Sequence, residues 1–416
     1  MIYLQGKKTK KESFMKTVGI VCEYNPFHTG HMRQIDILRE SGAEIIVCAM
    51  SGNFTERGEL TVADKYVRAE AAIKCGADVV VELPFPYSSM SAEGFCSAGV
   101  HILSSLGCDT LSFGSESADE HLLRRAAEII ASPEFIADYA EVGKKQGSAK
   151  AYFDLLATHL CDGAKLLSND ILGISYIAAI NRLNSQMDVF PIAREGAAYK
   201  ETELSDTYPS ATALRRAVKN APDGFFSLGE DKIPTPALET LKGAQTGGIA
   251  PIFTDSIGSD ILSFFKLISP DEIVARAIQK SGGGECVACD GCGIVDRICS
   301  SAKKARNFEE FLANSYTSRY TDARINRVIL FSLLGVSDAF EKSLPEYTTL
   351  LGAGEIGRKY LSEIRKTLDF PVVTKPADAP EGALTDIIRL SDSLYASAMP
   401  KGVNFDYFLK KHPYMG

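Results

Sequence analysis

Short apolar runs alternate with helical patterns over the first half of the chain. Four runs are apolar almost throughout, at 17–24, 43–50, 78–84 and 109–114. The segments between them place apolar side chains every three or four residues, at 31–40, 63–76 and 94–107. Runs that are apolar throughout are typical of strands buried on both faces, so the pattern predicts a parallel, doubly wound α/β sheet covered by helices.

A helical insertion and a second region follow this predicted sheet. The insertion spans about 118–164, and after it 168–183 has the pattern of a capped helix and 188–194 that of a further strand. Beyond about residue 222 the chain is rich in Gly and Pro and then mostly helical in pattern. We therefore predict a tail over 1–14, an α/β domain over 15–222 and a mainly helical domain over 223–416.

The composition is that of a globular protein without a membrane anchor. Of 416 residues, 45% are hydrophobic and 24% are charged, and no apolar run approaches the roughly 20 residues of a membrane-spanning helix. The net charge of −8 argues against a protein that coats nucleic acid non-specifically, because that affinity comes from Lys and Arg. The start of the chain lacks an apolar signal core, and most of the ten cysteines lie in apolar or helical contexts. We expect a cytoplasmic protein with no membrane association and no disulfides.

The turn after the first predicted strand, NPFHTGH, is the strongest candidate for chemistry. In an open parallel sheet, ligands bind at the carboxyl ends of strands, where helix N-termini present unpaired N–H groups to anions. His28 and His31 lie three residues apart at the predicted helix start, and Gly30 lets a phosphate approach the backbone. Imidazole donors and a helix dipole stabilise the charge that develops when an α-phosphate is displaced. We expect His31 to be the principal donor and His28 to act from the other side; two satisfied surface histidines are the alternative.

Polar residues after the second predicted strand are further candidates. The loop SGNFTERGE carries Asn53 and Arg57, which are candidates for contacts with a carboxylate or pyrophosphate. A solvated loop charge is an equal alternative for Arg57. For Lys65 and Arg68 on the next helix, solvated charges are the preferred interpretation.

Later segments add weaker candidates for phosphate contacts. Gly114 ends a strand, where it either contacts a nucleotide through its backbone or simply turns the chain. Asn169 lies at the start of a helix, where capping is an equally good interpretation. Ser210 and Thr212 come just before a helix that carries Arg215, a combination that hydrogen-bonds phosphates in some proteins.

HTGH followed far downstream by SATALRR resembles the signature pair of the nucleotidylyltransferase superfamily. More narrowly, VGIVCEYNPFHTGH, MSGNFTERGE, FGSES, LSNDILGISYI and GEIGRKYL together look like the bacterial tRNA(Met) cytidine acetate ligase family, from about residue 15 to the C-terminal region. The resemblance implies a Rossmann-like, parallel-sheet nucleotidylyltransferase domain followed by a mostly α-helical domain that binds tRNA. It also implies the activity: acetate is activated with ATP and Mg²⁺ to acetyl-adenylate, and N4 of the wobble cytidine of elongator tRNA(Met) is acetylated. No DNA partner is expected.

The resemblance, together with the later phosphate candidates, also defines an expected ATP site. Its residues are Val21, Cys22, Glu23, Tyr24, Asn25, Pro26, Phe27, His28, Thr29, Gly30, His31, Met32, Arg33, Gln34, Gly114, Asn169, Arg194, Glu195, Ser210, Thr212 and Arg215. Glu195 departs from the apolar residue that the resemblance implies after Arg194.

A Cys-rich segment, GGGECVACDGCGIVDRIC, raises the question of a metal. Cys286, Cys289, Cys292 and Cys299 include two successive spacings of three, which suit zinc or an iron–sulfur cluster. We prefer a variable loop that carries thiols, because the family resemblance supplies no metal and ATP chemistry needs only Mg²⁺. We therefore expect no tightly bound metal or cofactor.

Residues 301–330 are the candidate RNA-binding segment, with six Lys and Arg against three Asp and Glu. The candidate residues are Arg319, Arg324, Arg327, Tyr316 and Tyr320. Arg324 and Arg327 lie one helical turn apart, and tyrosines can stack on unpaired bases. An amphipathic helix with a solvated basic face is an equal alternative.

Two other functions stay open on the sequence. One is a nucleotidylyltransferase that acts on a phosphorylated small metabolite. The other is a non-catalytic protein with the same fold that binds RNA or a nucleotide.

Overall fold

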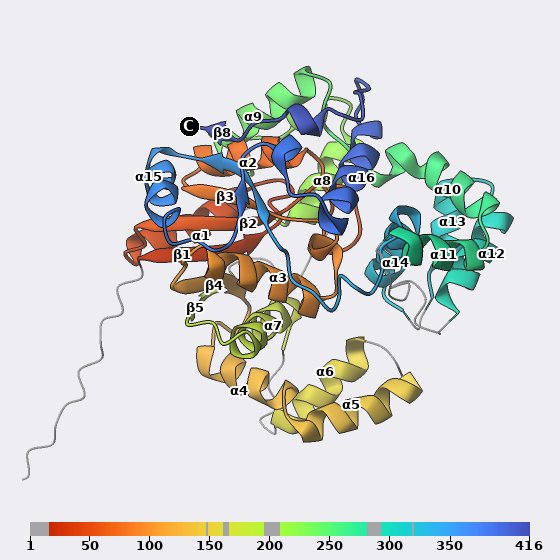
Figure 1. The fold of residues 1–416 in the computed structure, drawn as a ribbon, viewed down its shortest axis with the longest axis horizontal. Coiled ribbons are helices and arrows are strands. Elements are labelled where there is room, and N and C mark those ends of the chain that lie inside the picture. Colours follow the sequence, from red (N-terminus) through yellow and green to blue (C-terminus); the bar gives the residue numbers. More distant parts are fainter. Residues whose placement is uncertain (1–15, 147–148, 161–165, 195–208, 281–292, 318–319) are drawn as a thin grey trace, which may run out of the picture.

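The computed structural model describes residues 16–146, 149–160, 166–194, 209–280, 293–317 and 320–416. Its centre is a mixed sheet in the order β5-β4-β1-β2-β3-β6-β7, with β8 paired to β6 (Figure 1). The strands are β1 Thr17–Cys22, β2 Ile45–Ser51, β3 Val79–Leu83, β4 Thr110–Ser115, β5 Asp188–Ala193, β6 Thr348–Ala353, β7 Val372–Val373 and β8 Tyr414–Met415. The first five are parallel, as predicted, and the chain order reverses at β1, which lies between β2 and β4.

Helices cover both faces of this sheet (Figure 1). α3 (Ala92–Ser105) packs on β1, β2 and β3, and α7 (Ser168–Arg182) packs on β4. α2 (Lys65–Lys74) packs on β2, β3 and β6 and contacts α9 (Thr235–Thr246). The contact between α3 and β1 needs a residue without a side chain, since a Cβ at Gly99 would lie 2.6 Å from Val21 Cγ2. The predicted Rossmann-like α/β architecture is thus confirmed.

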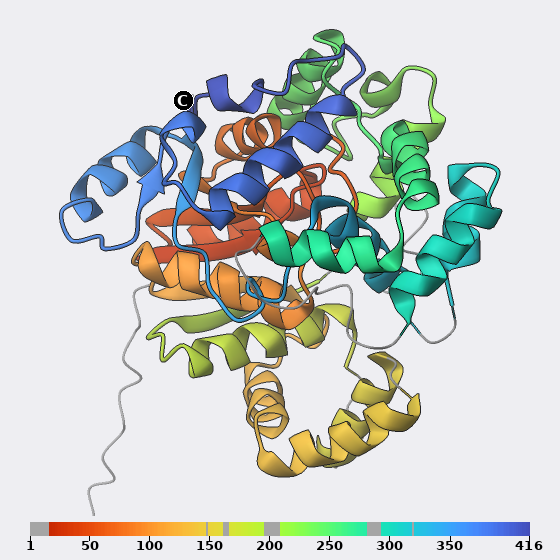
Figure 2. The same ribbon diagram turned by 45° about the vertical axis from the view of Figure 1, so that its right-hand side comes forward.

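The remaining helices form two further groups and several single elements (Figure 2). α4 (Glu120–Ile130), α5 (Pro133–Gln146) and α6 (Ala149–Leu160) make an arm in the predicted insertion; α10 (Gly258–Leu267), α11 (Pro270–Lys280), α12 (Ile294–Lys304), α13 (Phe308–Ser315) and α14 (Asp322–Leu334) make a helical lobe. The others are α1 (Thr29–Glu40), α8 (Ala211–Asn220), α15 (Glu355–Ile364) and α16 (Ala383–Ser397). Among the described helices, none combines the length and apolarity that crossing a membrane requires.

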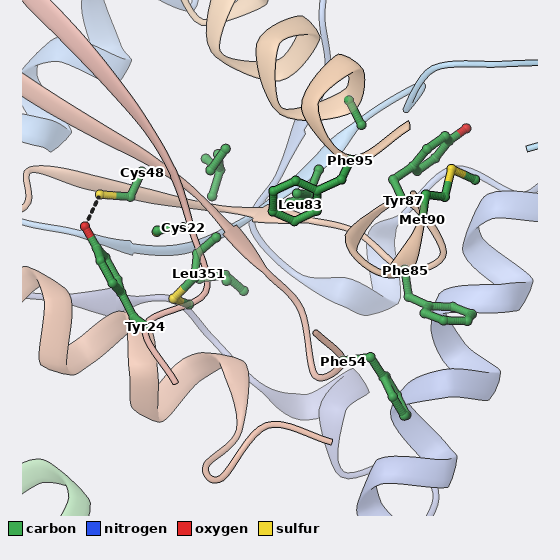
Figure 3. Close-up of a cluster of buried hydrophobic side chains, with 14 of the residues drawn as sticks. Cys22, Tyr24, Cys48, Phe54, Leu83, Phe85, Tyr87, Met90, Phe95 and Leu351 are labelled. Carbon is green, nitrogen blue, oxygen red and sulfur yellow. Dashed lines mark hydrogen bonds between the residues drawn. The ribbon is translucent and has the colours of Figure 1, made fainter. Parts of the chain in front are cut away.

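The apolar core continues from the sheet into the loops that follow the strands (Figure 3). At one end Tyr24 Oη lies 3.5 Å from Cys48 Sγ. At the other, the ring of Phe85 lies 5.5 Å from that of Phe54 and 5.9 Å from that of Phe331, measured between centroids. These rings join the loops after β2 and β3 to α14.

The C-terminal region is largely helical, as predicted, but it also extends the sheet. β6 pairs with β3 in the antiparallel direction, and β7 and β8 pair with β6. The boundary predicted at residue 222 therefore lies between segments that share one sheet. A short apolar run looks alike in parallel and antiparallel strands, so the pattern of β6 does not reveal its partner.

Lys65 and Arg68 are fully buried, so the expectation of solvated charges on a helix face was wrong. Lys65 Nζ donates to Glu82 Oε1 at 2.7 Å and to Asp392 Oδ2 at 2.8 Å. The Arg68 guanidinium donates to four backbone carbonyls, all in or next to the loops after β1 and β2. The local sequence does not show these partners, because one of the carboxylates lies on β3 and the other on α16.

Candidate functional site

A cavity of about 380 Å³ opens where the strand order reverses. The connections from β1 and β4 leave toward opposite sides of the sheet, which parts the loops at their carboxyl ends. A volume of this size falls in the range of roughly 300–1,000 Å³ that is usual for small-molecule sites. The residues expected from the sequence that line it are Val21, Cys22, Glu23, Tyr24, Asn25, His28, Gly30, His31, Arg33, Gln34, Arg57, Gly114, Asn169 and Arg194.

His28 and His31 stand at the start of α1 with stacked rings, 3.7 Å between centroids. His28 Nδ1 accepts a hydrogen bond from the backbone N–H of Gly30 at 3.1 Å. His31 Nδ1 accepts one from the backbone N–H of His28 at 3.3 Å. Together these bonds form a capping box, so the backbone of the helix start holds both imidazoles in place.

Both imidazoles are neutral. Burial, assisted by the charge of Arg194, lowers the pKa of His28 to about 3. Burial also lowers the pKa of His31 well below its ordinary value, with His28 and Arg194 adding to the effect. A neutral imidazole carries one N–H, and Nδ1 is an acceptor in both rings, so the proton is on Nε2 in each. The site therefore presents two fixed, uncharged Nε2–H donors, which suit phosphate oxygens.

The aromatic side chains of the turn before α1 pack against the ring of His31. Tyr24 has φ +46°, in the left-handed region that residues other than Gly rarely adopt. Its ring lies 4.8 Å from those of Phe27 and His31. Asn25 Oδ1 accepts from the backbone N–H of Val62 at 2.7 Å, which anchors the turn to the loop before α2. The strained turn thus fixes where the donors of His31 point.

Three exposed arginines, Arg33, Arg57 and Arg194, line the same cavity. Within the described part of the chain, their side chains form no hydrogen bond or ion pair. Unpaired guanidinium groups on a cavity wall attract carboxylates and phosphates. Gly114 allows Arg194 to lie against the end of β4, since a Cβ there would be 3.3 Å from Arg194 Cγ.

A second helix N-terminus, that of α8, also reaches the cavity through its first residues. Ser210 Oγ caps this helix by accepting a backbone N–H of its first turn at 3.1 Å. Arg215 donates to Thr212 Oγ1 at 3.3 Å and to the backbone carbonyl of Asn25 at 2.9 Å. Ser210, Thr212 and Arg215 do not line the cavity themselves. Arg215 ties the start of α8 to the turn before α1, so that both helix N-termini can face one anion.

Asn169 lines the cavity from the start of α7. Its backbone N–H donates to Glu116 Oε2 at 3.1 Å, and its side-chain amide also donates to Glu116. Capping does not explain this residue, because the N-cap of α7 is Leu167. Glu116 therefore fixes the amide at the cavity wall.

Asn53 does not line the cavity. Its amide donates to Asp392 Oδ1 and its oxygen accepts from the backbone N–H of Lys65, both at 2.9 Å. Both polar groups are therefore committed inside the protein, and the geometry gives no support to a contact with acetate or pyrophosphate. Four other residues expected at the ATP site do not line the cavity: Pro26, Phe27, Thr29 and Met32.

Several predicted residues lie outside the described part of the chain. They are Glu195, Cys286, Cys289, Cys292 and Arg319. Cys299 is a buried free thiol in α12. Among the described residues there is no group of three or more His, Cys, Asp or Glu side chains placed to hold a metal ion.

The sequence reasoning missed Glu56 and an apolar part of the wall formed by Phe95, Phe113, Leu172 and Tyr176. The acidic neighbour of Arg57 in the loop was an available signal for Glu56. The apolar residues offered none, because their spacing is that of ordinary core positions in a strand and two helices.

The predicted RNA-binding residues are partly committed to the protein. Arg327 donates to Glu56 Oε1 at 2.8 Å, and Tyr316 Oη donates to Asn326 Oδ1 at 3.1 Å. The guanidinium carbon of Arg324 lies 4.9 Å from the centroid of the Tyr320 ring. In the structure, Arg327 therefore binds the loop after β2, which lines the cavity through Glu56, and Arg324 lies over the ring of Tyr320.

Comparisons with known proteins show the family to which the chain belongs. The family model described as HIGH Nucleotidyl Transferase matches residues 15–406. The chain is 33% identical to the tRNA(Met) cytidine acetate ligase of Listeria monocytogenes, over 91% of this chain and 94% of the relative. It is 32% identical to that of Caldanaerobacter subterraneus, over 87% and 89%. The crystal structure of Thermotoga maritima TmcAL bound with alpha-thio ATP superposes with a TM-score of 0.83 at 30% identity, covering 96% of this chain and 99% of that chain.

Proposed function

Because the chain belongs to the HIGH nucleotidyl transferase family and, within it, to the tRNA(Met) cytidine acetate ligases, we propose that its cavity binds ATP and acetate for the first of two reactions. The protein is an ATP-dependent ligase that joins acetate to a cytidine of tRNA(Met). In the first reaction an acetate oxygen attacks the α-phosphorus of ATP, acetyl-adenylate forms and pyrophosphate leaves. In the second, N4 of the wobble cytidine of elongator tRNA(Met) attacks the acetyl carbonyl and AMP leaves.

The stacked pair of neutral imidazoles carries this proposal. The Nε2–H groups of His28 and His31 donate to phosphate oxygens, and the N-termini of α1 and α8 face the same anion. Arg194 supplies the positive charge that balances the transition state. Arg57 is the remaining candidate for binding acetate or pyrophosphate. Since backbone hydrogen bonds fix the imidazoles before the substrates bind, little reorganisation is needed during the reaction.

Mg²⁺ would enter as part of the substrate, bound to the triphosphate. Mg²⁺ keeps several water ligands and binds mainly through phosphates in sites of this kind, so it does not need a cage of protein ligands. The ion would draw charge from the departing pyrophosphate. The protein groups then have to orient the α-phosphate and exclude a competing water.

The helical lobe is the proposed binding region for the tRNA. Its helix α14 reaches the cavity wall through the ion pair between Arg327 and Glu56. An RNA bound along α14 would therefore have its anticodon loop close to the site of acetyl-adenylate. Arg324 and Tyr320 are the candidates for phosphate and base contacts.

The test is incubation with ATP, radiolabelled acetate and elongator tRNA(Met), followed by nucleoside analysis. We expect label in N4-acetylcytidine. His31→Gln should lower the rate of acetylation by about 100-fold, because it removes one fixed donor to the transition state. A Gln at this helix position can still accept the N–H of His28, so the capping box is retained. His121→Ala, at an exposed position of α4, is the matched control and should leave the rate unchanged.

Two outcomes would refute the proposal. Pyrophosphate release that ignores acetate and tRNA but responds to a phosphorylated metabolite would indicate a nucleotidylyltransferase. Binding of ATP or RNA without any turnover would indicate a non-catalytic protein.

A further inference from the structure

Two carboxylates lie in a cavity whose other features suit anions. Glu23 and Glu56 line the same cavity as His28, His31 and Arg194. ATP and acetate are anionic, and so is the backbone of tRNA. A carboxylate near them raises their energy unless it has another partner. The two acids therefore need an explanation beyond the binding of ATP and acetate.

The ion pair with Arg327 accounts for Glu56. Arg327 Nη1 donates to Glu56 Oε1 at 2.8 Å and to its backbone oxygen at 3.1 Å. The two side chains are 16% and 28% exposed. The backbone of Gly58, in the same loop, packs closely against α14, since a Cβ on Gly58 would lie 2.7 Å from the backbone nitrogen of Arg327. Glu56 thus holds the loop after β2 against α14, and its charge is neutralised.

Glu23 is held in place without being neutralised. Its Oε1 accepts the backbone N–H of Glu56 at 2.8 Å, and its backbone carbonyl accepts from the buried Arg68 guanidinium. These bonds fix the residue directly after β1, at the reversal of the strand order. Within the described ranges no Lys, Arg or His forms an ion pair with its carboxylate, and Oε2 accepts no hydrogen bond. The cavity therefore contains one positioned carboxylate with a free acceptor.

We propose that Glu23 Oε2 receives the 4-amino group of the target cytidine and takes its proton during acetylation. This inference rests on the proposed function and assigns a residue to its second reaction. Among the reacting groups, only the amine donates hydrogen bonds; the phosphates, acetate and the acetyl carbonyl accept them. A carboxylate only accepts, so it matches the amine and none of the others.

The chemistry of the second reaction requires such a partner. The lone pair of the cytosine amine is delocalised into the ring, which makes N4 a poor nucleophile. N4 forms the bond to the acetyl carbon, and the bond from that carbon to the AMP oxygen breaks with its electron pair on AMP. The proton of N4 passes to Glu23 and then to water, so the products are N4-acetylcytidine, AMP and a proton. Uridine is rejected at the same place, because its O4 is an acceptor facing another acceptor.

Glu23→Gln separates the two reactions. Gln retains the size of the side chain and an oxygen for the N–H of Glu56, but it does not take up a proton. The first reaction is measured as acetate-dependent exchange between ATP and labelled pyrophosphate, and we expect this rate to fall far less than the rate of transfer. The second is measured as single-turnover transfer from enzyme-bound acetyl-adenylate to tRNA(Met), and we expect at least about a 100-fold loss. Glu40→Gln, at the exposed end of α1, is the matched control and should change neither rate.

Three results would overturn the inference. Exchange that falls as far as transfer would mean that Glu23 acts on ATP or its Mg²⁺. Transfer at the wild-type rate would mean that it has no part in the second reaction. If Glu23→Gln melts at a lower temperature than the wild type, Glu23→Asp is measured in the same two assays. A transfer rate of Glu23→Asp no higher than that of Glu23→Gln would also overturn the inference. Absence of acetate-dependent exchange in the wild type would instead refute the proposed function, and the inference with it.

Discussion

Replacing Lys65 by Met is expected to destabilise the protein far more than the same change at an exposed position of α2. The ammonium of Lys65 is fully buried and donates to Glu82 Oε1 at 2.7 Å and Asp392 Oδ2 at 2.8 Å. Burial by itself lowers the pKa of Lys65, but Asp392 and Glu82 outweigh it and raise the pKa, so the group stays charged. Met occupies a similar volume and leaves both carboxylates buried without a cation.

The size of the effect follows from the burial. Removing one partner of a buried ion pair costs about 3–5 kcal/mol. That is a large share of the roughly 5–15 kcal/mol by which folded proteins are stable. Lys74 is exposed, and its contacts with Glu70, Thr240 and the Tyr414 ring lie at the surface, so replacing it should cost no more than about 1–2 kcal/mol.

The cost should also depend on pH. Burial raises the pKa of Asp392 to about 6, with Lys65 opposing the rise and Glu82 adding to it. A carboxyl whose pKa is higher in the folded state stabilises the fold fully below its unfolded pKa and loses that contribution as pH rises through the folded value. Without Lys65 the folded pKa of Asp392 rises further. The difference in the free energy of unfolding between the wild type and Lys65→Met should therefore be small near pH 5 and reach its full size near pH 8.

Thermal unfolding followed by circular dichroism at several pH values is the assay. Lys74→Met is the matched control, since it removes an ammonium from the same helix. At about pH 8 we expect Lys65→Met to lower the melting temperature by several degrees more than the control. Equal losses for the two variants, or a Lys65→Met loss that does not shrink toward pH 5, would refute the reasoning.

Three further predictions concern Asp392, Gly114 and Arg327. Asp392→Asn should remove a decline in stability of about 3 kcal/mol that this carboxyl causes between about pH 4 and pH 6; unfolding curves whose pH dependence matches that of the wild type would contradict it. Gly114→Ala should displace the side chain of Arg194, whose Cγ would lie 3.3 Å from the new Cβ, and raise the KM for ATP by up to about tenfold; an unchanged KM in steady-state assays would exclude this contact from the nucleotide site. Arg327→Met should leave Glu56 without its partner, destabilise the protein by about 1–3 kcal/mol and raise the KM for tRNA; if melting temperature and KM both stay at wild-type values, Arg327 does not hold the loop.

The order of the elements was predictable because periodicity and helix capping are properties of short windows. The runs at 17–24 and 188–194 correspond to β1 and β5, and the pattern at 168–183 corresponds to α7. Element ends were less well predicted: the helix expected from about His31 begins at Thr29, because His28 is already its N-cap. The placement of NPFHTGH at the cavity follows from the same reasoning, since loops at the carboxyl ends of parallel strands meet at one edge.

The partners of single charged and polar residues were not predictable in this way. Asn53, Lys65 and Arg327 looked like ligands or solvated charges in their local context. In the structure, their partners are 339, 327 and 271 positions away along the chain. Burial of a charge depends on whether an opposite charge arrives from another element, and no window around the residue contains that information.

The sequence by itself determined the alternating sheet-and-helix order, the helical C-terminal region and the two-histidine turn, because neighbouring residues encode them. Only the tertiary structure decided that both imidazoles are neutral Nε2–H donors, since their desolvation depends on the packing around the turn. It also decided which carboxylates are neutralised: Arg327, from α14, pairs with Glu56 and leaves Glu23 as the free acceptor in the cavity. A charge acquires its role from what surrounds it in space, and at this site the surroundings come from distant parts of the chain.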